Sequence, residues 1–111
     1  MVDKDLVKLI NKLMKKLKLN IPCDFGFKKT KEHGIWVEMT RGALFTKHTP
    51  TQNIQITVKL GRVKNGYLSC QDIVNQIVEM LSKQPACMNI ATQYAGEFEN
   101  DTYYYITCKL L

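Results

Sequence analysis

The sequence lacks the features that mark catalytic, metal-binding and membrane-spanning proteins. Nowhere in its 111 residues do the ~20 consecutive apolar residues of a membrane span occur. Its four cysteines include no CxxC pair, and its two histidines complete no zinc-ligand spacing. The glycines form neither a GxxxxGK[ST] nor a GxGxxG phosphate-binding pattern. We therefore expect reduced thiols that pack as small hydrophobic groups in a cytosolic compartment, and no cofactor.

Length and composition indicate one folded domain over residues 1–111. The chain is 45% hydrophobic and 23% charged, as in ordinary globular proteins. Its apolar residues near the N-terminus are spaced and not continuous, which argues against a signal peptide. The net charge is +6, and many of the lysines fall in the first eighteen residues. Such a charge suits a polyanionic partner, and equally a solvated lysine surface that keeps the protein dispersed.

Apolar residues at three- and four-residue steps predict two amphipathic helices. The first spans about 3–19, with lysines opposite its apolar stripe. The second spans about 69–81, with Ser69 and Asp72 as a capping box and Pro85 as its stop.

Alternating or short apolar segments predict five strands. The segment 53–60 alternates most regularly, which is typical of an antiparallel strand with one buried side. The order is α-β-β-β-α-β-β, so we predict an α+β fold with a mixed, mostly antiparallel sheet and two helices packed on one face. If the third and fourth strands are parallel neighbours, the second helix crosses over the sheet. The predicted strands are 21–27, 35–40, 53–60, 89–98 and 102–110.

A search for catalytic groups leaves one candidate nucleophile. Cys70 is expected in the first turn of the second helix, where the helix dipole would lower the pKa of its thiol. His33 or His48 could serve as its base, but nothing in the sequence brings either one near. We therefore predict that the chain is not an enzyme.

Basic and aromatic residues leave a nucleic-acid-binding function open. Tyr103 and Tyr105 lie on the outer face of the last strand, where they could stack on bases or cover an inter-subunit surface. No basic-aromatic motif of RNA-binding sheets accompanies them. Two basic residues occur in each long connector: Arg41 and Lys47 in the first, Arg62 and Lys64 in the second.

The order of elements and the C-terminal segment resemble a known family. The pattern consists of the first amphipathic helix, the 35–40 strand, the long loop before the alternating Gln52–Leu60 strand, the Ser69–Leu81 helix, and the closing passage Gly96–Tyr105. In these features the chain resembles phage tail-terminator and minor capsid proteins of the head–tail neck, and it would be a single tail-terminator-like α+β domain.

The resemblance implies a structural protein of the virion, located at the neck or tail terminus and assembled in the host cytoplasm. It would form a ring, commonly a homohexamer, that ends polymerisation of the tail-tube protein and meets the head connector, with no membrane partner. A related neck role, as stopper or adaptor, and a small basic nucleic-acid-binding module stay open as alternatives.

The same resemblance assigns roles to several residues. A docking loop would include Arg41, Leu44, Phe45, Lys47 and His48, although an ordinary hairpin loop is the alternative. Arg62 and Lys64 would line a channel that holds DNA without base readout. Tyr103 and Tyr105 would form an inter-subunit face.

Overall fold

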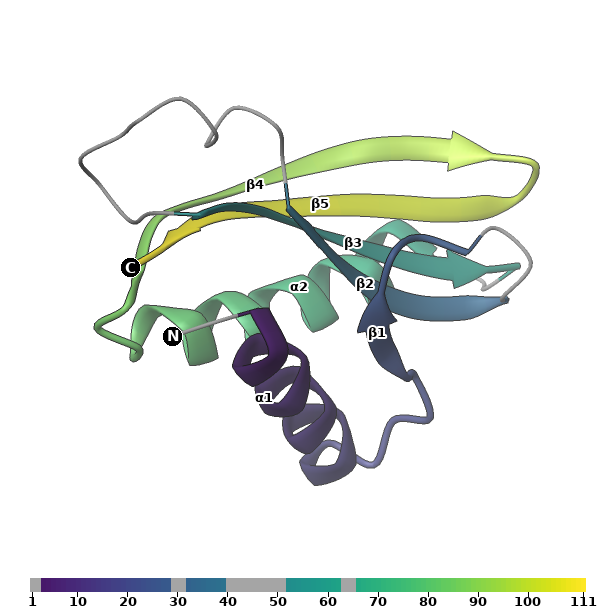
Figure 1. Cartoon of the computed structure of the whole chain (residues 1–111). Coiled ribbons are helices and arrows are strands. Elements are labelled where there is room, and N and C mark those ends of the chain that lie inside the picture. Colours follow the sequence, from purple (N-terminus) through teal and green to yellow (C-terminus); the bar gives the residue numbers. More distant parts are fainter. Residues whose placement is uncertain (1–2, 29–31, 40–51, 63–65) are drawn as a thin grey trace.

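The computed structural model describes residues 3–28, 32–39, 52–62 and 66–111 (Figure 1). It confirms the α+β fold and the predicted order of two helices and five strands. In chain order the elements are α1 (Asp3–Lys16), β1 (Cys23–Phe25), β2 (His33–Met39), β3 (Gln52–Gly61), α2 (Gly66–Ser82), β4 (Cys87–Phe98) and β5 (Asp101–Leu110).

The five strands form one sheet in the order β1-β2-β3-β5-β4. Only the β1–β2 pair is parallel, and the other three pairs are antiparallel. Both helices cover the same face of this sheet, and no helix of the described residues lies on the opposite face, which we call the uncovered face (Figure 1). β3 and β4, which α2 connects, run in the same direction but are not neighbours, because β5 lies between them. The crossover between adjacent parallel strands is therefore not formed.

The helix boundaries differ from the prediction for local reasons. α1 ends at Lys16, since Lys18 adopts a left-handed φ of 58° and the Leu19 N–H donates to the Met14 carbonyl at 2.9 Å, as in a Schellman motif. The predicted capping box at Ser69 is wrong, because α2 already begins at Gly66. A Cβ at Gly66 would collide with the side chain of Thr102, so glycine permits this close approach of helix and sheet.

The core lies between the two helices and the covered face of the sheet. Leu6 and Ile10 of α1 and Ile77 of α2 are fully buried in one cluster with apolar side chains of the strands. Ile56 of β3 pairs with Ile106 of β5 at the centre of this layer. Burial of these branched apolar side chains is the main force that holds the helices on the sheet.

Candidate functional site

The best nucleophile candidate is a buried core residue. Cys70 is fully buried, and its thiol lies 3.9 Å from the Val58 carbonyl in the geometry of a weak hydrogen bond. Burial raises its pKa to about 12. The expectation that the helix dipole lowers this pKa is wrong, because α2 begins earlier and Cys70 packs against the sheet. A neutral, inaccessible thiol is not a nucleophile near neutral pH.

The other cysteines and His33 also have structural roles. None of the four cysteines forms a disulfide, and burial raises the pKa of Cys23 to about 12 and that of Cys108 to about 11. The Nδ1 atom of His33 accepts a hydrogen bond from the Gly61 N–H at 3.0 Å, which ties β2 to the end of β3. Within the described ranges, no three His, Cys, Asp or Glu side chains gather as a metal site would require.

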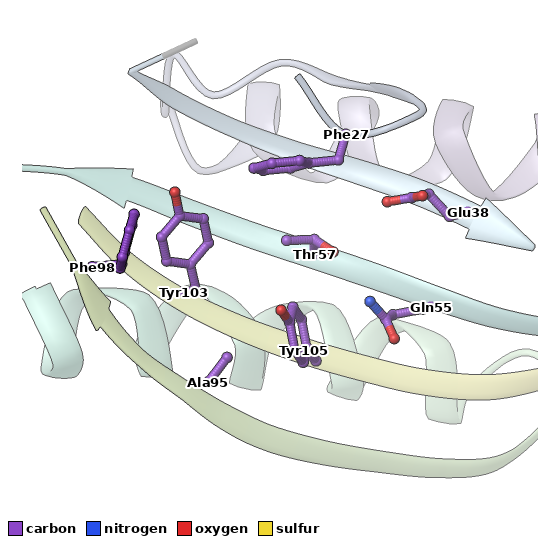
Figure 2. Close-up of a pocket in the computed structure, with 8 residues that line it drawn as sticks. All are labelled: Phe27, Glu38, Gln55, Thr57, Ala95, Phe98, Tyr103 and Tyr105. Carbon is purple, nitrogen blue, oxygen red and sulfur yellow. The ribbon is translucent and has the colours of Figure 1, made fainter. Parts of the chain in front are cut away.

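The face of the sheet without helices carries an aromatic cluster. Trp36 lies on β2 and Tyr103 on β5, with β3 between them. Phe27 contacts both rings, at centroid distances of 4.9 Å to Trp36 and 6.1 Å to Tyr103. It therefore extends over β3 and joins the two neighbouring strands, as Figure 2 shows for Phe27 and Tyr103. Gly34 makes room for Trp36, since a Cβ there would lie 2.5 Å from the indole ring.

This cluster buries two polar residues that sequence alternation placed on an exposed side. Thr57 is 4% exposed and Lys59 only 2%. The register places Lys59 between Gly34 and Tyr103 on the same face. Its ammonium forms an ion pair with Asp101 at 3.5 Å, which compensates the buried charge. The prediction of one buried side for 53–60 is therefore wrong at this end of β3.

Beside the cluster, the uncovered face is hollowed into a groove of about 510 Å³. We call it the open-face groove. It crosses the sheet from Glu38 on β2 to Ala95 on β4, and its side chains lie on the side away from the helices (Figure 2). The aromatic rings of its lining are those of Phe27, Phe98, Tyr103 and Tyr105. Burial first, and then the charge of Asp101, raise the pKa of Tyr103, so its hydroxyl acts as a neutral hydrogen-bonding group.

The electrostatic character of the open-face groove does not suit a phosphate backbone. None of the described residues that line it is basic, and Glu38 is its charged member. Exposed lysines lie along α1, which packs on the opposite face of the sheet (Figure 1), whereas Lys109 of β5 is exposed on the same face as the groove but does not line it. The groove itself therefore presents aromatic rings without a lysine or arginine in its lining, whereas single-stranded nucleic-acid sites combine rings and basic side chains in one groove.

The structure describes only some of the site residues that were predicted from the sequence. Tyr103 and Tyr105 both lie on the uncovered face and line the groove, so the structure brings them together. Arg62 is exposed at the end of β3, and its backbone N–H donates to the Asn100 carbonyl at 3.1 Å, so it adjoins the β4–β5 turn. The other predicted site residues lie outside the described residues: Arg41, Leu44, Phe45, Lys47, His48 and Lys64.

Sequence reasoning did not find Phe27, Phe98 or Glu38 as members of this surface. Phe27 was expected in a strand that reaches residue 27, but β1 ends at Phe25 and the chain then turns at Gly26, which has a φ of 70°. Glu38 could have been assigned from its even spacing with Trp36 on one face of β2. Phe98 has no such signal, because its place depends on two bulges in β4.

Comparison with known proteins adds no family assignment: no protein-family model matches the chain, and no curated protein matches it either. Neither helix in the described part of the chain has the length and apolarity needed to cross a membrane.

Proposed function

We propose that the chain is a structural assembly protein of a phage virion, a tail terminator that forms a homohexameric ring at the neck end of the tail tube. The ring ends polymerisation of the tail-tube protein and joins the tail to the head connector. Catalysis has no part in this role, because matching surfaces decide where the tube stops.

One observation carries this proposal: an uncovered sheet face with an aromatic groove. Large side chains such as Phe27, Tyr103 and Tyr105 are concentrated there, and aromatic residues are enriched where proteins associate. Tyr103 and Tyr105 lie on β5, which holds their side chains in fixed positions before a partner arrives. A rigid, preformed surface suits a protein that must recognise the last ring of a tube.

Two alternative functions would use different surfaces of the chain or different partners. A stopper or adaptor of the neck would use the same face with a different neighbour. A nucleic-acid-binding module is favoured by one specific observation, the exposed lysines along α1. If DNA passes through the ring, these lysines and Arg62 would supply diffuse charge without base readout.

The test combines oligomeric state with tube length. Size-exclusion chromatography with light scattering and negative-stain microscopy should detect a ring, either alone or after addition of tail tubes. Purified tail-tube protein encoded beside this chain's gene should form shorter tubes when the chain is present. A strictly monomeric protein that leaves tube length unchanged would refute the proposal. Binding to DNA that falls steeply with salt, without effect on tubes, would favour the nucleic-acid alternative.

A further inference from the structure

The turn between β4 and β5 exposes a large aromatic side chain between two carboxylates. Phe98 is 56% exposed, and Glu97 and Glu99 on either side of it are also exposed. We call these three residues the acidic tip. Glu99 and Asn100 form the loop between the two strands, and their φ values of 52° and 70° are those of a two-residue type I′ turn.

The charges around the tip are mixed, but neither Glu97 nor Glu99 forms an ion pair with another described residue. Asp101 is already paired with Lys59, and Arg62 adjoins the turn through its backbone. Glu97 and Glu99 are the carboxylates that flank the aromatic ring in sequence and face solvent.

A second feature, at the C-terminal end of α1, has the complementary character. A groove of about 400 Å³ lies there, and we call it the α1 groove. Its apolar lining includes Met14 and Ile21, which are buried, and Leu19, which is 37% exposed. Lys15 lines the groove, and Lys18 beside it is exposed. A cavity of about 150 Å³ already accepts benzene, so this volume accommodates a phenylalanine ring with adjoining backbone.

We propose that the acidic tip of one copy docks in the α1 groove of a second copy. Phe98 is the apolar anchor against Met14 and Leu19, and the glutamates of the tip meet Lys15 and Lys18. An aromatic anchor in an apolar pocket with charges at the rim is the usual arrangement of a binding hot spot. This inference rests on the proposed function, since it identifies the contact by which the ring would close.

The symmetry of the contact depends on whether two chains can exchange their tips reciprocally. The acidic tip lies at the end of the sheet and the α1 groove at the far end of a helix, well separated in Figure 1. We infer a contact that is not reciprocal, so that when one tip fills one groove, the pair still has one undocked tip and one unfilled groove. Such a head-to-tail contact continues until rotation closes a ring. A two-fold dimer, by contrast, would leave nothing free.

The experiment uses exposed positions, so the fold is preserved, and circular dichroism verifies this. Glu99→Lys alters the tip and Lys15→Glu alters the α1 groove. Lys8→Glu is the matched control, because it makes the same charge change on an exposed residue of the same helix about two turns away. Sedimentation velocity and light scattering measure assembly of the full chain.

We expect each tip or groove variant to weaken assembly about tenfold, and Lys8→Glu to leave it unchanged. The double variant Glu99→Lys/Lys15→Glu should regain assembly, because it restores opposite charges across the contact. A third variant, Phe98→Ser, removes the aromatic anchor of the tip and keeps the groove intact. In an equimolar mixture with Lys15→Glu chains, the intact tip of a Lys15→Glu chain can dock in the intact groove of a Phe98→Ser chain. Assembly should stop at this complex of two chains, because the other tip and the other groove are both defective.

The outcomes separate this inference from the proposed function. If every variant assembles to the same extent as the wild type, the inference is overturned and the tail-terminator role stays in place. A wild type that stays monomeric would also overturn the inference, while tube length would still decide the proposed function. Failure of the charge-swapped double variant, with the control intact, would exclude the pairing of these two surfaces.

Discussion

Replacing Asp101 by asparagine should leave the ammonium of Lys59 buried without its carboxylate. Lys59 is 2% exposed under the aromatic cluster, whereas the side chain of Asp101 is 22% exposed. Removing one partner of a fully buried pair costs about 3–5 kcal/mol. Because water reaches the Asp101 side of this pair, we expect about 2–3 kcal/mol for Asp101→Asn.

The informative comparison is Lys59→Met, which removes the charge and keeps most of the side-chain volume. Lys59→Met leaves the Asp101 carboxylate without its ammonium, but the Asp101 side chain is 22% exposed and water can solvate it, so the loss of unfolding free energy should be smaller than for Asp101→Asn, about 1 kcal/mol. The double variant should be more stable than Asp101→Asn alone, since it no longer carries the buried ammonium that has lost the Asp101 carboxylate.

Urea unfolding measures all three variants. Trp36 is the sole tryptophan of the chain and is 3% exposed, so its fluorescence reports loss of the aromatic cluster. Circular dichroism at the same urea concentrations tests two-state behaviour. A larger loss of unfolding free energy for Lys59→Met than for Asp101→Asn would refute the reasoning that the buried ammonium of Lys59 depends on Asp101.

Four other outcomes test the packing of the core and the burial of Cys70. Ile106→Ala should lower the unfolding free energy by about 2–5 kcal/mol in the same titration, because the side chain is fully buried, and a loss below about 1 kcal/mol would contradict that burial. Gly34→Ala should cost about 1–3 kcal/mol and weaken the near-ultraviolet dichroism of Trp36, whose ring lies 2.5 Å from the added Cβ; an unchanged spectrum would argue against this contact. Iodoacetamide at about pH 8 should label Cys87 before Cys70, as mass spectrometry would show, whereas rapid labelling of Cys70 would restore it as a nucleophile. Since burial raises the pKa of Cys70 from 9.0 to about 12, the unfolded state loses this proton first, and stability should fall as pH rises through that interval.

The sequence predicted the order of elements because hydrophobic periodicity follows directly from which face each element buries. The apolar stripe of α1 and the alternation of β5 are confirmed. Element ends were less accurate. Ser69 matched a capping pattern, yet the contact between Gly66 and Thr102 starts α2 earlier, and these residues are distant in the chain.

The interaction surface could be predicted only in part. Tyr103 and Tyr105 were assigned to the outer face from alternation alone, and they do line the open-face groove. Burial of Lys59 depends on Phe27, Trp36 and Tyr103 meeting across three strands. Such a meeting is set by sheet order, which no local pattern encodes.

The position of β5 in the sheet has a consequence for how the chain folds. Gln52 of β3 pairs with Leu110 of β5, so the central strand pair joins segments that α2 and β4 separate along the chain. Contacts of such long range form slowly, because the loop between them must close first. A nascent chain that has folded only as far as β3 therefore presents the backbone of that strand as an open edge. Until β5 pairs with β3, the exposed edge of β3 can pair with the same strand of another chain. Correct folding therefore requires β5 to pair with β3 before a second chain does.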